Sequence, residues 1–260
     1  MKRFTLAPIA LMACFSFLTM PEINAQEMGN LETYAENQLG EAVEPVIKLF
    51  GSLAGAGFVN TADLHGIAGF EIGIRGNLSF VPGEYKDSGP LDGVDVVGLP
   101  FLQASVGLPA NLEITGRVFS LAVSDDTDGN VTVVGGLVKY GLFQAPLLPK
   151  VSLVAGYHAL VTPEDYDFGT FNVMSLKAFV SHNFLVFTVY GGAGIDRASS
   201  KITIEDSGNY PGGFEKTYSE SGANGTFGLT ISPFPFIKAN ADYSFGDFKS
   251  LSLGLAFSFR

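Results

Sequence analysis

Eight charged residues occupy alternating positions within otherwise apolar stretches of the chain, where an ionised side chain is costly unless it is paired. Both signs are present, so these side chains could form ion pairs, line a charge-selective pore or hold a polar ligand. Mutual neutralisation that keeps neighbouring strands in register is the interpretation we favour. The eight candidate site residues are Glu71, Arg75, Glu113, Arg117, Lys139, Lys177, Lys238 and Asp242.

Residues that could perform nucleophilic catalysis are sparse. His158 shares an expected strand face with Ser152, and Asp165 follows in the next connection. The sequence has no glycine-flanked serine of the kind that forms a nucleophile elbow, and His65 and His182 stand alone. We therefore expect no enzymatic activity.

Metal and cofactor signals are equally weak. The stretch from Asp126 to Asn130 resembles part of a calcium loop, but the glutamate that completes such a loop is missing. An Asp-Gly pair in this stretch suits a tight hairpin turn instead. The single cysteine, Cys14, falls in an expected signal peptide, so the mature chain is expected to have neither disulfides nor thiolate metal ligands. We expect no cofactor.

The first 25 residues have the features of a cleaved signal peptide. Lys2 and Arg3 precede an apolar run that extends to Met20, and a site with small residues ends at Ala25. A lipoprotein signal is the alternative, because Cys14 follows a small residue, but the chain stays apolar beyond it. The sequence therefore predicts export across the inner membrane.

The composition favours β structure with a large apolar surface. Apolar residues make up 47% of the 260 residues, and the chain has 32 glycines and 23 phenylalanines but no tryptophan. Beyond the signal peptide no run approaches the roughly 20 apolar residues of a spanning helix. The net charge is −11, and removal of residues 1–25, which carry a net +1, leaves −12. Such acidity argues against a nucleic-acid partner.

From Gly66 onward, apolar and polar residues alternate with the period of two that strands have. Most of these segments are longer than ten residues, whereas strands of soluble domains cluster near about 5–6 and a tilted membrane strand needs about 9–11. The expected strands are roughly 66–81, 99–108, 110–124, 130–143, 149–161, 170–182, 184–198, 222–234, 235–246 and 249–259.

The connections between these strands alternate in character. Every odd-numbered connection contains acidic residues and most are long, whereas every even-numbered one lacks acid. Outer-membrane barrels have this asymmetry, with long external loops and short periplasmic turns. We therefore predict an all-β, transmembrane antiparallel barrel of about ten strands in the outer membrane. A secreted β-sandwich or lipocalin-like barrel is the alternative, because it too has one apolar face per strand.

The last segment, 249–259, resembles the closing strand of bacterial outer-membrane β-barrels. In that class the terminal aromatic residue is read by the barrel-assembly machinery, which implies this role for Phe257 and Phe259. Residues 50–82 resemble the opening of an uncharacterised family of outer-membrane barrels. More weakly, the stretch from Gly57 to Ala62 is similar to the long-chain fatty-acid transporter group, whose N-terminal segment forms a hatch inside the barrel.

The chain thus divides into a signal peptide (1–25), a helical and glycine-rich segment (26–65) and the barrel (66–260). Segment 26–65 is expected to be a luminal plug, a helix at the periplasmic end or a disordered leader. Two functions remain open. One is passage or binding of a small apolar molecule through a lumen gated by this segment. The other is a structural or interaction barrel with a closed lumen, whose acidic loops 82–98 and 199–221 contact external partners. Outer-membrane lipid is a partner of either.

Overall fold

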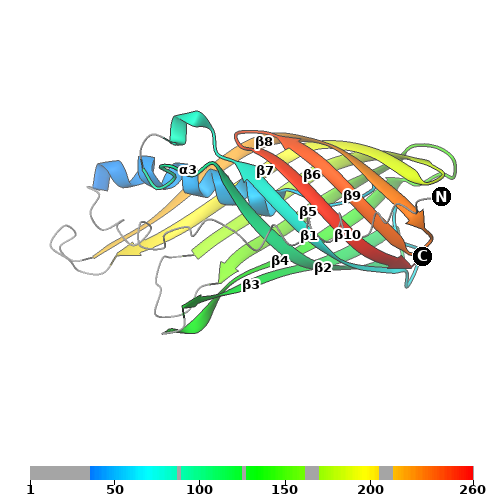
Figure 1. The fold of residues 1–260 in the computed structure, drawn as a ribbon, viewed down its shortest axis with the longest axis horizontal. Helices are drawn as coiled ribbons and strands as arrows, with labels where there is room; N and C mark the ends of the chain where they lie inside the picture. The colour runs from blue at the N-terminus through cyan, green and yellow to red at the C-terminus, as the bar shows by residue number, and fades with distance from the viewer. Residues whose placement is uncertain (1–35, 87–88, 125–126, 162–169, 205–212, 260) are drawn as a thin grey trace, which may run out of the picture.

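The computed structural model describes residues 36–86, 89–124, 127–161, 170–204 and 213–259 (Figure 1). Within these residues the chain forms one long helix, α3 (Glu36–Gly55), the short 3-10 helix η3 (Gly83–Tyr85) and ten strands. The strands are β1 (Phe70–Phe80), β2 (Val96–Leu108), β3 (Leu112–Ser124), β4 (Thr127–Phe143), β5 (Lys150–Val161), β6 (Thr170–Phe184), β7 (Phe187–Ile204), β8 (Phe214–Phe234), β9 (Ile237–Phe245) and β10 (Lys249–Phe259).

The ten strands close into one antiparallel barrel. Each strand pairs with the next along the chain, and β1 pairs with β10 over its whole length, from Phe70 opposite Phe259 to Phe80 opposite Lys249. This closure leaves neither edge of the sheet unpaired, as a barrel requires. The predicted fold class is confirmed, and the predicted bounds of the last strand are those of β10.

The two ends of the barrel differ in their connections. We call the end with the connections after β1, β3, β5, β7 and β9 the loop end, and the opposite end the turn end (Figure 1). The chain between β6 and β7 is only Leu185 and Val186, and that between β8 and β9 only Pro235 and Phe236. The C-terminal residue of β10, Phe259, also lies at the turn end.

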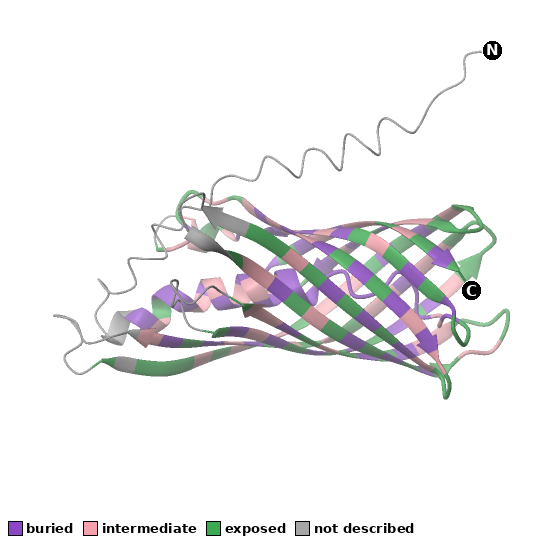
Figure 2. Cartoon of the chain, turned by 90° about the horizontal axis from the view of Figure 1, so that it is seen from below, coloured by how far each residue is buried: buried purple, intermediate pink, exposed green. Residues whose placement is uncertain are grey.

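The wall of the barrel has an apolar outer face and a mostly polar inner face. Figure 2 shows the accompanying alternation of buried and more exposed residues along the strands. On β1, Ile72 and Ile74 are about half exposed, whereas Glu71 and Arg75, which flank this pair, are buried. On β6, Leu176 is exposed and its neighbour Lys177 is buried. The alternation read from the sequence therefore corresponds to the outside and the inside of the barrel.

The predicted loop 199–221 is wrong in extent. β7 continues to Ile204 and β8 begins at Phe214, so most of this stretch is a two-stranded ribbon at the loop end. The sense of its alternation is reversed, because Ala198, Ile202 and Tyr218 face the helix while Lys201 and Ser219 are exposed. Polar residues on the outer face concealed these strands in the sequence.

Within the described residues, the predicted helical region forms a single helix, α3. Pro45 lies inside α3 without ending it, and the glycine-rich stretch belongs to the last turns of the helix. Glycine is needed there by close approach, since a Cβ at Gly51 would lie 3.1 Å from Ala198 Cβ and one at Gly55 2.4 Å from Asp196 Oδ2. Among the described residues, no helix is both long and apolar enough to cross a membrane.

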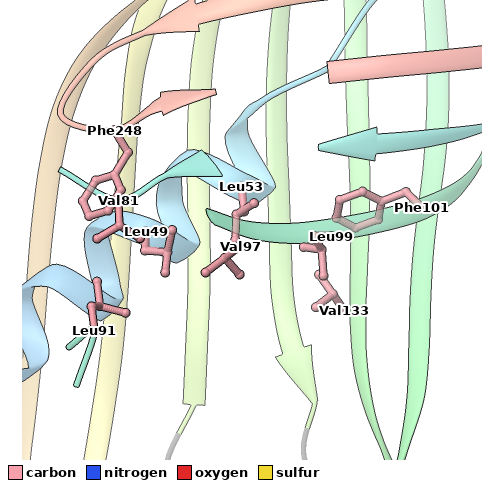
Figure 3. Packing of buried hydrophobic residues seen from close by; sticks show 9 residues of the cluster. All are labelled: Leu49, Leu53, Val81, Leu91, Val97, Leu99, Phe101, Val133 and Phe248. Carbon is pink, nitrogen blue, oxygen red and sulfur yellow. The ribbon is translucent and has the colours of Figure 1, made fainter. Parts of the chain in front are cut away.

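The helix lies at the loop end, and not at the end with the short turns, where one of the three alternatives for segment 26–65 placed it. Its first half packs against Phe171 at the start of β6 and Ile202 near the end of β7. The second half packs in the cluster of Figure 3, where Leu49 and Leu53 meet inward residues of β2, β4 and the loop-end connections. The partners in this cluster are Val81, Leu91, Val97, Leu99, Phe101, Val133 and Phe248.

Candidate functional site: the plugged lumen

The candidate site is the lumen together with residues 39–65, which we call the plug. The plug contacts the wall from the loop end to the turn end. Ser52 hydrogen-bonds to Ser250 at the loop-end side of β10, and His65 hydrogen-bonds to Ser258 at its turn end. The chain after α3 continues through the lumen and reaches β1 only beyond His65. The plug therefore fills the barrel along its length.

The end of α3 is held by two cations of the wall. Lys177 Nζ donates to the Gly55 carbonyl at 2.8 Å, and the Arg117 guanidinium donates to the carbonyls of Ala54 and Ala56 at 3.3 Å. These carbonyls lack helical partners and carry the negative end of the helix dipole. The last turn of α3 has no basic residue of its own. The wall thus supplies the cap that the helix lacks.

Aromatic and amide side chains complete this cap. Arg117 lies 4.2 Å from the ring centre of Phe101, and Lys177 Nζ lies 4.8 Å from that of Phe58 in the plug. Such cation–π contacts favour a buried cation. Asn77 Nδ2 donates to the carbonyls of Leu53 and Ala56 at 2.8 and 3.0 Å. Strands on opposite sides of the lumen therefore converge on one helix terminus.

A second anchor lies at the turn end around His65. Its Nδ1 and its backbone N–H both contact Glu113 Oε2, at 2.8 and 2.9 Å, and its Nε2 lies 3.4 Å from Glu71 Oε2. Glu113 also pairs with Lys139, and Glu71 with Lys238, each at 2.7 Å. His65 is therefore held between two ion pairs of the wall.

These neighbours shift the pKa of His65, which lies in the chain before the first strand. Burial alone favours the neutral imidazole, but the hydrogen bonds to Glu113 and Glu71 outweigh burial and raise the pKa of His65. A proton on His65 thus strengthens the turn-end anchor.

Side-chain and backbone polar groups of the plug between the two anchors are also satisfied by the wall. Asn60 Nδ2 donates to Glu71 Oε1 at 2.7 Å, and Thr230 donates to the Asn60 carbonyl at 2.6 Å. The Ala62 N–H donates to Ser181 Oγ at 3.0 Å, and Ser152 donates to the Ala62 carbonyl. An extended segment without a sheet partner is thereby made compatible with burial.

All eight predicted charges face the lumen, and all but the half-buried Lys238 are buried. Arg75 pairs with Asp242 at 3.3 Å, in addition to the Glu71 and Glu113 pairs described above. Only Glu113 and Lys139 lie directly opposite each other on neighbouring strands. Glu71 and Arg75 each reach past β10 to β9, so these pairs link the wall across a strand instead of fixing adjacent register.

Several site residues were not identified from the sequence. Asp196 pairs with Lys177 at 2.9 Å, and Tyr190 donates to Asp242 at 2.9 Å. Asp196 falls on the inward face of β7 together with Gly194 and Ala198, so continuing the alternation past the predicted strand interior could have found it. His65 gave no such signal, because its partners are distant in sequence.

The residues considered for catalysis do not assemble. Ser152 bonds the plug, whereas the His158 ring stacks on Phe58 at 5.6 Å and lies near Arg117. Asp165 and Asp126 lie outside the described residues. Within the described part of the chain, no three His, Cys, Asp or Glu side chains are grouped so that they could hold a metal ion.

The lumen retains little free volume at two places next to the plug. A cavity of about 10 Å³ lies beside Glu71, Arg75, Gln103 and Asn240, enough for about one water molecule. A cavity of about 50 Å³ lies at the loop-end mouth beside Lys48, Asp196 and Asp247. A larger concavity of about 580 Å³ is lined mainly by outward apolar residues, including Ile74, Leu102 and Val118.

These features define a closed ten-stranded antiparallel barrel occluded by its own N-terminal segment. The chain belongs to the DUF6588 family, a family of unknown function, whose model matches residues 1–88 and 87–259. This membership confirms the predicted resemblance to an uncharacterised family. No curated protein matches the chain, and no comparison supports the weaker similarity to the long-chain fatty-acid transporter group.

Solved structures with detectable likeness are also barrels. The N-terminal β-barrel domain of Pseudomonas aeruginosa OprF is 17% identical, covering 75% of this chain and 100% of that one, with a TM-score of 0.34. Ail, the attachment invasion locus protein of Yersinia pestis, is 14% identical over 75% and 99%, with a TM-score of 0.32. The translocator domain of the autotransporter NalP from Neisseria meningitidis is 13% identical over 87% and 98%, with a TM-score of 0.39. Because these superpositions are loose, the description of the fold rests on the strand register of this chain.

Proposed function

We propose that this protein resides in the bacterial outer membrane as a barrel whose lumen is closed by the plug, and that it presents its loop end to partners outside the cell. Three observations support the proposal: the apolar outer surface, the anchored plug and the acidic loop end. The anchored plug carries the choice between the two functions left open by the sequence.

The outer surface supports membrane insertion. On β7 the outward residues are apolar or small from Phe187 to Ile195 and become polar from Arg197 onward. About nine to eleven tilted residues of this kind suffice to cross a bilayer. Burying so many exposed apolar side chains in lipid is favourable, whereas water would leave a patch far above the few hundred Å² usual for soluble proteins.

Phenylalanine takes the place of tryptophan at the turn-end rim. Phe70 and Phe259 have ring centres 5.9 Å apart, and Phe236 lies 5.9 Å from Phe257. Phe184 and Phe187 form a further pair at 5.1 Å. Aromatic girdles mark the interfaces of outer-membrane barrels. The same outward position of Phe257 and Phe259 leaves them available to the barrel-assembly machinery, which stays a prediction.

The anchored plug supports a closed lumen. The carbonyls that end α3 accept hydrogen bonds from Asn77, Arg117 and Lys177, so moving the helix would leave these carbonyls and the buried Arg117 with unsatisfied hydrogen bonds. Leaving a buried polar group unsatisfied costs about 1–3 kcal/mol, and more for a charged group. A plug held this firmly acts as part of the core.

Acidic residues of the first loop-end connection are directed to solvent. Glu84, Asp92 and Asp95 are exposed, while Val81 and Leu91 of the same connection pack on the plug. The connection thus has a buried apolar side and an exposed acidic side. This arrangement favours contact with external partners of positive charge.

Passage or binding of a small apolar molecule is the second candidate function. It is favoured by the apolar lining of the loop-end half of the lumen, where Val97, Leu99 and Phe101 face α3. Displacement of the helix would expose the apolar loop-end half of the lumen, next to its polar turn-end half. In that case the plug would serve as a gate.

Reconstitution of the mature protein into lipid vesicles tests both functions. Insertion is checked first: the unboiled protein should migrate faster on a gel than the boiled one, as a closed membrane barrel does. A closed barrel should then show no solute-driven swelling and no stable conductance, and steady conductance of the wild type would contradict the closed lumen.

A variant lacking residues 26–57 separates the two candidates, provided that it keeps the faster unboiled band. Permeability in this variant, together with saturable uptake of a small apolar fluorophore by the wild type, would favour the gated function. A variant that stays impermeable would exclude passage through the lumen. Lys201→Met, at an exposed ion pair of the ribbon, serves as the control.

A further inference from the structure

The plug has a direction within the barrel. Its first described side chains, Leu39 and Val43, pack with Ile202 near the loop end of β7. In the middle of the plug, Arg117 caps the end of α3. The last residue, His65, contacts Glu113 next to the turn between β2 and β3. The chain therefore runs through the lumen from the loop end to the turn end before the first strand begins.

Part of the barrel has an apolar outer face, which we call the belt, and the first half of α3 lies beyond it on the loop-end side. Gly40 approaches the ring of Tyr218, where an added Cβ would be 3.2 Å from Cε1. Tyr218 belongs to the ribbon, whose outward residues at this level are polar, such as Ser199 and Lys201. If the belt is in the bilayer, this part of the helix stands on the loop-end side of the membrane.

The two ends of the barrel chain are thus on opposite sides. Phe259 lies at the turn end, opposite Phe70, whereas α3 begins at the loop end. A mature chain delivered from the periplasm keeps its C-terminal end there. Its N-terminal part must cross the plane of the membrane through the barrel.

We propose that the barrel carries the described N-terminal part of its own chain, α3, to the outer face of the membrane and displays the first half of this helix there. The proposal rests on the proposed placement in the outer membrane with the loop end outward. It adds that the wall holds the passing segment in one direction, by the helix cap at Arg117 and Lys177 and by the anchor at His65.

The charge of this part of the chain is consistent with the loop end. Residues 26–44 contain five glutamates and neither lysine, arginine nor histidine. The loop-end connections also contain acid, whereas the turn-end connections 109–111, 144–149, 185–186 and 235–236 contain none. Display of the first half of α3, which contains Glu41 and Glu44, would therefore extend an already acidic external surface.

Thiol labelling of intact cells tests the proposal. Cys14 is the only cysteine and lies in the predicted signal peptide, so a single introduced cysteine gives a single site. Glu41→Cys probes the exposed side of α3, Thr217→Cys the exposed ribbon, and Leu185→Cys the turn between β6 and β7. The reagent is a membrane-impermeant maleimide, applied before and after permeabilisation of the outer membrane.

The expected result is that E41C and T217C react in intact cells, at least tenfold faster than L185C, which reacts only after permeabilisation. Reaction of E41C only after permeabilisation would overturn the proposal, whether or not T217C reacts in intact cells. Each variant must keep the faster unboiled band of the wild type. Recovery of the wild type in the soluble fraction would instead contradict the membrane placement, so the two failures are distinguishable.

Discussion

The two halves of the lumen hold the same plug by different physical means. In the loop-end half, Ile47 and Leu53 of α3 pack on apolar side chains of the wall. In the turn-end half, His65 is fixed by Glu71 and Glu113, each paired with a lysine. Apolar packing tolerates small shifts, whereas paired charges require one geometry. The comparison indicates that the apolar half stabilises the plug by burying apolar surface, whereas the charged half fixes the position of the plug.

The largest effect is expected from breaking the charged half. Glu113→Ala removes the partner of both Lys139 and His65 and leaves a buried cation unpaired. We expect a loss of about 3–5 kcal/mol in the free energy of unfolding. It can be measured as the shift in the urea midpoint at which the faster unboiled band disappears.

The matched control is Glu215→Ala, which breaks the exposed Lys201–Glu215 pair on the ribbon. Exposed pairs contribute at most about 1 kcal/mol, so this variant should unfold close to the wild type. Equal losses in the two variants would show that burial of the pair is unimportant.

A smaller effect is expected from trimming the apolar half. Ile47→Val removes one methylene group from a fully buried side chain of α3, and we expect a loss of about 0.5–1.5 kcal/mol. Ile195→Val makes the same change on the outer face of β7, where the side chain is exposed, and should cost less. The same urea midpoints measure both. A loss from Ile47→Val as large as that from Glu113→Ala would remove the distinction between the halves.

The smallest effect is a pH dependence confined to the charged half. Because the pKa of His65 is raised in the folded protein, its contribution is full below the unfolded pKa and is lost as pH rises through the folded pKa. The charged groups that face His65 are Glu71 on β1, Glu113 on β3 and Lys238 on β9. The free energy of unfolding should therefore fall as the pH rises above about 6.5, the unfolded pKa of histidine.

His65→Gln keeps a hydrogen-bond donor but does not titrate, so this variant should lose most of that pH dependence. Ile47→Val should keep it, since Ile47 belongs to the apolar cluster of the loop-end half. An unchanged pH dependence in His65→Gln would assign the titration to another group.

The barrel could be predicted from the sequence because alternation reports directly which residues face in and which face out. The exceptions on β5 are informative. Val154 and Leu160 break the alternation, and in the structure both point inward against the plug, Val154 at Phe58 and Leu160 at the helix clusters. An apolar residue on a polar face therefore marked the place where the lumen is filled.

The direction of the plug could not be predicted, because it depends on contacts between residues far apart in the chain. The glycines of α3 gave a flexible appearance, although Gly51 and Gly55 permit close approach to the wall. The partners of the ion pairs could not be predicted from the sequence either. The sequence places Arg75 and Asp242 on inner faces, but only closure of β1 onto β10 brings them within reach of each other.

The order of the elements along the chain has a kinetic consequence. The plug precedes every strand, yet its partners include Ser250 and Ser258, which are separated from Ser52 and His65 by 198 and 193 residues. Contacts of such long range form late, because the intervening chain must first be brought together. The plug, which is synthesised before the described strands, is therefore among the last segments to complete its contacts, and the seam between β1 and β10 encloses it.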